Sequence, residues 1–460
     1  MDEPKPLNHS CLHRRFRSAL PILALTVVAC ISLEPNAVLR ISGSEFNELA
    51  QIVADRRKLT PTTRLQLEPE AAASDTAPAQ TTAREYYGPV SITQLEATYK
   101  DIGLLAAHDD FAASWAEYRT LVQQTTLDRT QGTIRLSRAA FQLGAPWEKN
   151  HPAAARQFPA VIGVMQAWQE QRFNWSRRIS TALFEDRRLS LRAIATGDIL
   201  LTATRAPNES ENRKISAEQL DMMWQIAGEI EKSAARLPDF FRAQAVFPYR
   251  HGGEFVSWAY SARGWQGVNG LYANPPLSTT QILHPEKYFI EKENPLRFFP
   301  AGLLLRLQNR ALIEQSLGEF CSRSLLEVAR SPKAAAETAK TWRGDQLFSF
   351  QTDNGMAVFW FSTWQDETSA RAFLRAYQDV LERRQKVGFE EIRQAKDLTV
   401  IAKGRPDRAW LLQSRGPVVL AIAASSADQL TEFVEQAWQD LEIEPEVMLV
   451  RFESSRINFR

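Results

Sequence analysis

The stretch that most constrains this chain is 161–175, which reads VIGVMQAWQEQRFNW. Apolar residues in and just before it recur at the three- and four-residue spacings of a helix, and these residues are Phe158, Val161, Ile162, Met165 and Trp168. That spacing places their side chains on one helical face, and a face so apolar packs against other parts of a protein. We therefore expect a core helix here, around which the rest of the fold is arranged.

The composition indicates a packed globular protein. A length of 460 residues favours two or three domains, and 44% of the residues are hydrophobic, including 12 Trp and 24 Phe. Lys and Arg total 55 against 54 Asp and Glu, so no global field attracts the chain to nucleic acid. We expect no nucleic-acid partner.

The N-terminus has the pattern of an export signal. Basic residues between positions 14 and 17 precede the apolar run Ala19–Ala29, which is short for a membrane span. The run ends in Cys30, and Val-Val-Ala-Cys resembles the lipobox of bacterial lipoproteins, in which this Cys is lipidated. Ordinary signal cleavage and an uncleaved signal anchor are the alternatives. We expect an exported protein, anchored to a membrane by an N-terminal lipid or signal segment, on the periplasmic or cell-surface face.

Changes in composition divide the chain into segments. Residues 60–84 are rich in Thr, Ala, Pro and Gln, cannot bury much apolar surface and are expected to form a flexible tether. The expected segments are a signal or lipobox segment 1–30, a membrane-proximal helix and flexible linker 31–85, a mainly helical domain 86–296, and a helix plus an α+β domain 297–460.

Local signals place several elements. Ser216 with Gln219 three residues later forms a capping box for a helix whose Met223 and Trp224 are expected in the core. Asp353-Asn354-Gly355 predicts a hairpin between two strands. Around it we expect helices over 312–329, 370–381 and 427–441, strands over 398–402, 410–413 and 418–423, and a short extended or loose segment after 442. The fold class is therefore α+β, with helices over one face of an antiparallel sheet.

The chain resembles a family of bacterial exported or lipid-anchored proteins related to HExxH zinc metallopeptidases. AWQEQRFNW in 167–175 is similar to the end of the family's HExxHALQDQHFDL segment, and 189–205 to its ALVEGDATL segment. The strongest similarity runs from Phe247 to Tyr288, where FPY, GW, PP and STTQILHPEKY match FPY, GW, PP and STEQILHPEKY of the relatives. The resemblance implies a zincin-like central domain.

The same resemblance implies that the metal site is vestigial. In an HExxH helix two His bind zinc and the Glu is the general base. Those positions hold Ile162, Gly163 and Gln166, and the third-ligand Glu aligns with Thr196 through the shared Gly-Asp pair at 197–198. None of these four residues can replace the family's zinc ligands or its general base. The resemblance thus implies a degenerate member with no catalytic residue, no metal and no cofactor.

Three functions remain open. The first is a non-catalytic pseudo-metallopeptidase that binds a peptide or protein partner, or supports assembly, at the membrane surface. The second is a hydrolase with a non-standard site made of Asp198, Glu170 and Glu185, although we expect the two Glu to be solvated and Asp198 to brace a helix. The third is a structural lipoprotein that interacts through its C-terminal sheet. We expect His284 to bond the backbone or a neighbouring side chain.

Overall fold

The computed structural model describes most of the chain after residue 41. The described residues are 42–59, 66–69, 78–88, 90–123, 125–128, 133–136, 140, 142–205, 213–308, 310–393, 397–405 and 407–446. They fall in one compact unit, Ile41–Arg460. Cys30 and the segment predicted to be an export signal lie outside the described residues.

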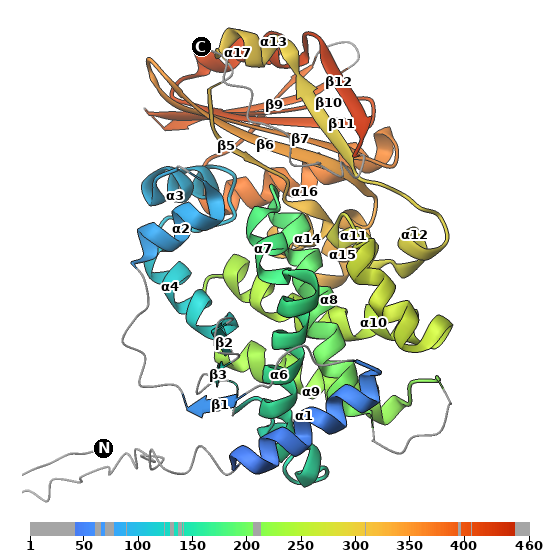
Figure 1. Ribbon diagram of the computed structural model, residues 1–460. Coiled ribbons are helices and arrows are strands. Elements are labelled where there is room, and N and C mark those ends of the chain that lie inside the picture. The colour runs from blue at the N-terminus through green and yellow to red at the C-terminus, as the bar shows by residue number, and fades with distance from the viewer. Residues whose placement is uncertain are drawn as a thin grey trace, which may run out of the picture. The chain divides into compact units, whose positions relative to one another are not determined.

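The first part of the unit is mainly helical (Figure 1). Its elements are α1 Gly43–Arg57, β1 Gln66–Pro69, α2 Ala79–Tyr87, α3 Ile92–Asp101, α4 Phe111–Val122, β2 Thr125–Asp128, β3 Thr133–Leu136, η2 Ala145–Trp147, α6 Pro152–Phe173, α7 Trp175–Thr181, α8 Glu185–Thr204, α9 Ala217–Ser233, α10 Asp239–Ala273, α11 Thr279–Leu283 and α12 Pro285–Phe289. The three short strands form a small sheet in the order β1-β3-β2.

The core helix expected over 161–175 is α6. It begins earlier, at Pro152, and ends at Phe173 because Asn174 adopts a left-handed conformation with φ of 50°. The apolar stripe faces inward as predicted: Phe158, Val161, Ile162 and Met165 are at most 4% exposed. Trp168 at the end of the stripe is partly buried.

Helices α8 and α10 cross with their backbones in contact. A Cβ atom on Gly197 of α8 would lie 2.1 Å from the carbonyl oxygen of Gly252 in α10, and a Cβ on Gly252 would lie 2.2 Å from that of Ala193. Only glycine allows so close an approach. Gly197 is one of the residues shared with the resembled family, and its place at this crossing gives it a packing role.

Helix α9 confirms one expectation and corrects another. Ser216 and Gln219 form the predicted capping box, and Met223 is buried. The prediction that Trp224 lies in the core is wrong, because its side chain is 47% exposed and its indole N–H donates to Glu254 at 2.8 Å. Neighbouring residues on a helix point about 100° apart, so burial of Met223 turns Trp224 toward the edge of the interface.

The segment expected to be a tether, 60–84, contains ordered elements. β1 pairs in parallel with β3, and the first residues of α2 lie in the same segment. Thr82 of α2 is buried and accepts a hydrogen bond from the indole of Trp115 at 2.9 Å. Thr82 is therefore part of the core, although it lies in a segment whose composition is typical of a linker. Its partner lies 33 residues further along the chain, so the local sequence does not reveal the contact.

The second part of the unit contains a large sheet. Its elements are β4 Leu296–Pro300, α13 Ala301–Arg306, β5 Ala311–Gln315, α14 Gly318–Leu326, α15 Pro332–Ala339, β6 Trp342–Thr352, β7 Gly355–Trp364, α16 Glu367–Gln385, β8 Glu390–Arg393, β9 Leu398–Arg405, β10 Arg408–Arg415, β11 Val418–Ala424, α17 Ala427–Trp438 and β12 Leu441–Pro445. The nine described strands run in the order β12-β4-β6-β7-β11-β10-β9-β8, with β5 also paired to β6.

Helices cover both faces of this sheet, which corrects the expectation of one covered face. Trp360 of β7 packs edge-on against Tyr377 of α16, with ring centroids 5.1 Å apart. The preceding residue, Phe359, packs against Phe433 of α17 on the other face. Figure 1 shows α16 on one side of the sheet and α13 with α17 on the other. Consecutive strand residues face opposite sides, and β7 is apolar on both.

The sheet was otherwise largely predicted. The hairpin at Asp353-Asn354-Gly355 joins β6 to β7, where Gly355 has φ of 113°. The helix expected over 312–329 is wrong at its start, because 311–315 form β5 and the helix α14 begins at Gly318. Of the two forms expected after 442, the structure has the extended one, and it pairs with β4 as part of β12. The chain is an α+β protein, as predicted.

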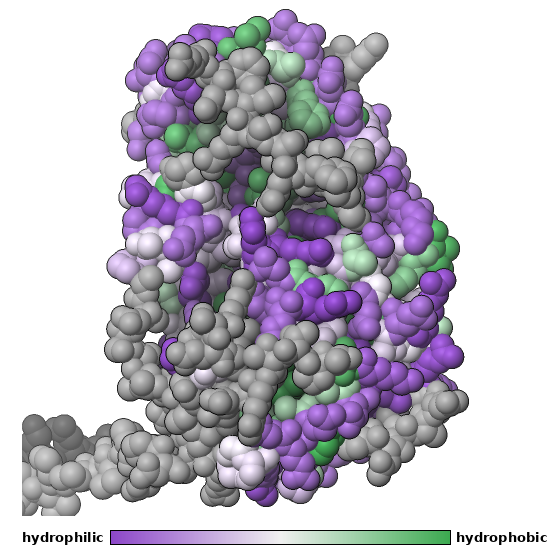
Figure 2. All heavy atoms as spheres, viewed as in Figure 1, coloured by the Kyte–Doolittle hydropathy of each residue, from purple (hydrophilic) through white to green (hydrophobic). Residues whose placement is uncertain are grey.

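No helix within the described residues is a candidate for a membrane span. None of the helices found there combines the length and the apolarity that crossing a bilayer requires. Figure 2 shows one face of the molecule, where hydrophilic residues predominate and hydrophobic ones form small separate groups.

Candidate functional site

The four positions that align with the metal site of the resembled family lie on two packed helices. Ile162 and Gly163 of α6 are buried, while Gln166 of α6 and Thr196 of α8 are partly buried. The helices are joined beside Thr196, where the Gln169 amide donates to the carbonyl of Ala195 at 3.0 Å. The Thr196 side chain makes no hydrogen bond within the described part of the chain.

These residues do not fit zinc. Ile162 has no donor atom, Gly163 has no side chain, and the amide of Gln166 and hydroxyl of Thr196 are poor zinc ligands beside imidazole and carboxylate. Across the residues that the structure describes, no group of three or more His, Cys, Asp and Glu could hold a metal ion. No metal chemistry is therefore assigned to this site.

Residues that match the resembled family form a buried polar network beside these positions. Gln169 donates to the hydroxyl of Tyr272 at 3.0 Å, and that hydroxyl donates to Asp198 at 2.8 Å. Burial is the main cause that raises the pKa of Tyr272 well above its usual value, and the Asp198 charge raises it further, so the phenol stays protonated as a donor. The network joins α6, α8 and α10.

Arg57 of α1 completes this network. One guanidinium nitrogen donates to Asp198 and to Asn269, both at 2.9 Å, and the Arg57 side chain is fully buried. Its guanidinium carbon lies 5.1 Å from the Trp168 ring centroid and 4.2 Å from that of Trp265. Two aromatic faces and one carboxylate thus stabilise a buried cation.

Sequence reasoning missed Arg57 and Asn269. Arg56 and Arg57 sit in the last turn of α1, where cations usually complement the helix dipole at the surface. The partners of Arg57 are distant in the chain, 141 residues away for Asp198 and 212 for Asn269. No local pattern signals such a contact.

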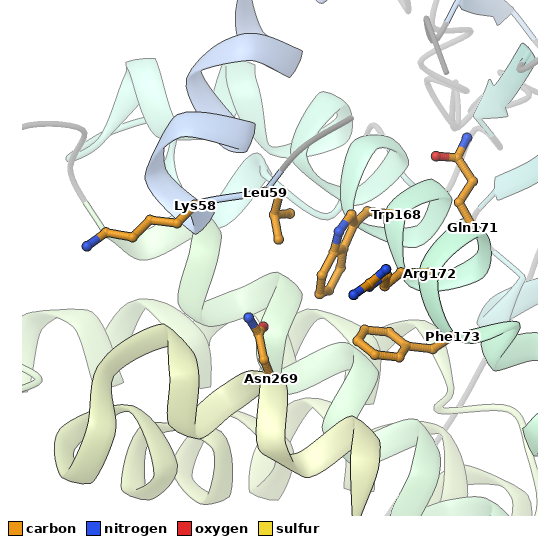
Figure 3. A pocket seen from close by; sticks show the side chains of 7 residues that line it. All are labelled: Lys58, Leu59, Trp168, Gln171, Arg172, Phe173 and Asn269. Carbon is orange, nitrogen blue, oxygen red and sulfur yellow. The ribbon is translucent and has the colours of Figure 1, made fainter. Parts of the chain in front are cut away.

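A cavity of about 480 Å³ lies against this network (Figure 3). Its walls come from the end of α1, the end of α6 and the second half of α10. The residues that line it are Lys58, Leu59, Trp168, Gln171, Arg172, Phe173 and Asn269. Trp168 and Asn269 belong to both the cavity and the Arg57 environment, so the buried network supports the cavity wall.

The alternative hydrolase residues are not gathered into a site. Asp198 is fully buried against Arg57. Glu170 is 9% exposed and accepts from the backbone of Ser176 at 2.8 Å, so the expectation that it is solvated is wrong. Glu185 is 0% exposed and accepts from the hydroxyl of Tyr86 at 3.1 Å, so the same correction applies. Each carboxylate caps or braces a separate helix end.

A second buried polar cluster joins the helical part to the sheet. Asp345 of β6 accepts four hydrogen bonds, from Ser316, Leu317, Gly318 and the Trp360 indole, at 2.9–3.0 Å. This carboxylate therefore caps the start of α14 and ties it to the neighbouring strand.

Asp186, at the start of α8, lies in the same cluster. One of its oxygens accepts from the backbone N–H and hydroxyl of Thr279, at 2.9 and 2.5 Å, and the other finds no partner among the described residues. Burial raises the pKa of Asp186 to about 7, opposed by the Thr279 hydrogen bonds and reinforced by the Asp345 charge. A Cβ on Gly318 would lie 1.8 Å from the bonded oxygen, so glycine is required there.

The two histidines of the FPY-to-EKY block have different surroundings. The His284 ring bonds Glu319 through Nε2 at 2.8 Å, and that hydrogen bond is the main cause that raises its pKa. His251 packs against Phe247, with ring centroids 5.2 Å apart, and burial lowers its pKa to about 3. The expectation that His284 bonds a neighbouring side chain is confirmed.

Comparisons with known proteins find a match only for residues 306–434, in the part of the chain that contains the large sheet. No curated protein and no solved structure matches the chain. Residues 306–434, which run from the end of α13 into α17, match a family described as a domain of unknown function (DUF8575). The sheet and its helices are thus similar to a recurring domain to which the match assigns no activity.

Proposed function

We propose that this protein is a non-catalytic member of a metallopeptidase-like group, exported to the cell envelope, where it binds a peptide or protein partner at the membrane surface. The observation that carries the proposal is the contrast between α6 and its surroundings. The metal positions hold Ile162, Gly163 and Gln166, whereas the hydrogen bonds among Gln169, Tyr272 and Asp198 around them are complete.

Packing favours a site that has been filled in. Ile162 is 1% exposed and belongs to the main hydrophobic core, so its side chain occupies protein interior. Gly163 inside α6 costs about 1 kcal/mol relative to Ala. Both features are compatible with a protein that keeps the fold but lacks the zinc ligands and the general base.

The binding role is supported by the cavity at the end of α6. Its volume of about 480 Å³ is in the range of small-molecule and peptide-end sites. It lies on the same helix as the vestigial positions, two turns further on, and not at those positions themselves. Membrane attachment rests on the N-terminal signal pattern ending in Cys30.

Metal analysis of two proteins tests the proposal. The wild-type chain is expected to contain far less than one zinc per molecule and to show no chelator-sensitive peptidase activity. The variant I162H/G163E/Q166H/T196E restores the ligand types of the HExxH pattern and is expected to bind about one zinc. Circular dichroism checks that the variant is folded, and a companion that retains Gln166 should bind zinc more weakly.

Two outcomes would count against this function. Stoichiometric zinc in the wild type that is lost on Q166A would show a working metal site. A folded quadruple variant that takes up no zinc would mean that α6 and α8 do not hold the metallopeptidase positions.

A further inference from the structure

The cavity beside α6 has walls that are fixed before any ligand arrives. Phe173 stacks on Tyr272 with ring centroids 4.5 Å apart and an interplanar angle of 7°. Trp168 meets Phe173 edge-on at 5.2 Å and Tyr272 edge-on at 5.8 Å, and it also contacts the buried Arg57 guanidinium. Figure 3 shows Trp168, Arg172 and Phe173 together on one side, with Leu59 and Asn269 facing them.

The lining carries N–H donors without matching acceptors. Lys58 and Arg172 are exposed cations that make no ion pair within the described residues, and no Asp or Glu lines the cavity. The Trp168 indole N–H likewise has no hydrogen-bond partner there. Lys58 extends away from the other side chains in Figure 3, so it supplies positive charge at the rim, whereas Arg172 lies beside the aromatic rings.

Asn269 adds a fixed donor. Its side-chain oxygen accepts from the buried Arg57 at 2.9 Å, which orients the amide. Its NH₂ group then points elsewhere, and it makes no hydrogen bond in the part of the chain that the structure describes. Three donors of different kinds, from Arg172, Trp168 and Asn269, thus border one cavity with aromatic and aliphatic walls.

We propose that this cavity binds a compact organic oxyanion, whose negatively charged oxygens meet Arg172 and Asn269 and whose apolar body lies against Trp168, Phe173 and Leu59. The inference rests on the proposed binding function and names its ligand class. A carboxylate at the end of a peptide and a phosphate monoester share this chemistry. The positive lining and the absence of a carboxylate among its residues favour an anion over a neutral or cationic ligand.

Calorimetric titration of the full-length protein separates these sources. The probes are N-acetylphenylalanine, its uncharged amide and phenyl phosphate. At least one of the two anions is expected to bind saturably, and more weakly as salt is raised, while the amide binds at least about tenfold more weakly. Binding of the carboxylate alone assigns a peptide end, and binding of phenyl phosphate alone assigns a phosphate ester.

Variants test the assignment to this cavity. R172Q keeps a long polar side chain without the charge and is expected to weaken the anion about tenfold. W168F keeps an aromatic wall and removes the indole donor, so a smaller loss is expected. The matched control R236Q removes an exposed charge in the α9–α10 connection, away from the cavity, and should leave binding unchanged.

The proposal is overturned if neither anion binds, if the amide binds as tightly as the acid, or if R172Q and R236Q behave alike. Zinc measured on the same samples keeps the two proposals apart. Stoichiometric zinc would refute the non-catalytic function whatever the anions do, whereas zinc-free protein that ignores all three probes would refute only the oxyanion assignment.

Discussion

Asp186 is the residue at which burial and charge conflict most clearly. Its side chain is 0% exposed, one oxygen lacks a described partner, and its pKa is raised to about 7 from an ordinary value of 3.8. Between these two values the folded protein holds a proton that the unfolded chain has released. Raising the pH through this window therefore destabilises the fold, and the penalty is complete above pH 7.

The variant D186N tests this sign. Because Asn stays neutral, the unfolding free energy of the variant relative to the wild type should rise by about 3 kcal/mol between pH 5 and pH 8, at about 1.4 kcal/mol for each of the two pH units up to the folded pKa. Urea denaturation at the two pH values measures the difference. D221N, which changes an exposed Asp of α9, should show no such trend. A D186N difference that is flat with pH would mean that Asp186 is ionised in the folded state throughout.

The residues of the candidate site were only partly predictable. Ile162, Gly163, Gln166 and Thr196 could be aligned because adjacent residues keep the resembled pattern. Arg57 could not be found, since its role depends on contacts that only the folded chain creates. The expected solvation of Glu170 and Glu185 failed for the same reason, because charge in the sequence does not reveal a buried partner.

Helices α8 and α10 pack through glycine rather than through large side chains. In an isolated helix Ala is more favourable than Gly by about 1 kcal/mol, so propensity alone favours G197A. The structure opposes this gain, because the new Cβ would overlap the carbonyl oxygen of Gly252. The crossing can accept the methyl group only by moving two backbones apart.

G197A should accordingly lower the unfolding free energy by more than about 2 kcal/mol, the cost of overpacking a tight contact. G228A in α9 is the matched control, since nothing lies within 4 Å of its added Cβ and a gain of up to about 1 kcal/mol is expected. Chemical denaturation of both variants gives the comparison. Equal effects at the two positions would contradict the close crossing.

Elements were predictable where the signal is local. The capping box of α9, the Asp-Asn-Gly hairpin and the amphipathic α16 all lie where their own residues indicate. β5 was missed because its short apolar run fits a helix equally well and becomes a strand only by pairing with β6. The extended form of β12 was one of two expected, but its pairing was not predicted, since β4, its partner, lies far away in sequence.

At the scale of the whole molecule, the proposed attachment point precedes the described unit by a short stretch of sequence, residues 31–41. A lipid at Cys30 would tether the protein to the bilayer and raise its concentration there. The proposed attachment would therefore favour a partner that is itself at the membrane.

Mass spectrometry of protein from the native envelope tests the attachment. The mature chain is expected to begin at Cys30 and to carry acyl groups, and C30A should lack them. C321A is the control, because Cys321 is 1% exposed and unavailable for modification, so this variant should remain acylated. A mature N-terminus at any other residue would contradict lipidation at Cys30.

The docking of α1 also has a consequence for the stability of the cavity. Arg57 at the end of this helix bonds Asp198 and Asn269, which lie 141 and 212 residues further along the chain. Docking therefore closes long loops and costs conformational entropy. Because Lys58 and Leu59 form one wall of the cavity, the cavity is complete only while α1 is docked. A ligand in the cavity would therefore stabilise the docked helix.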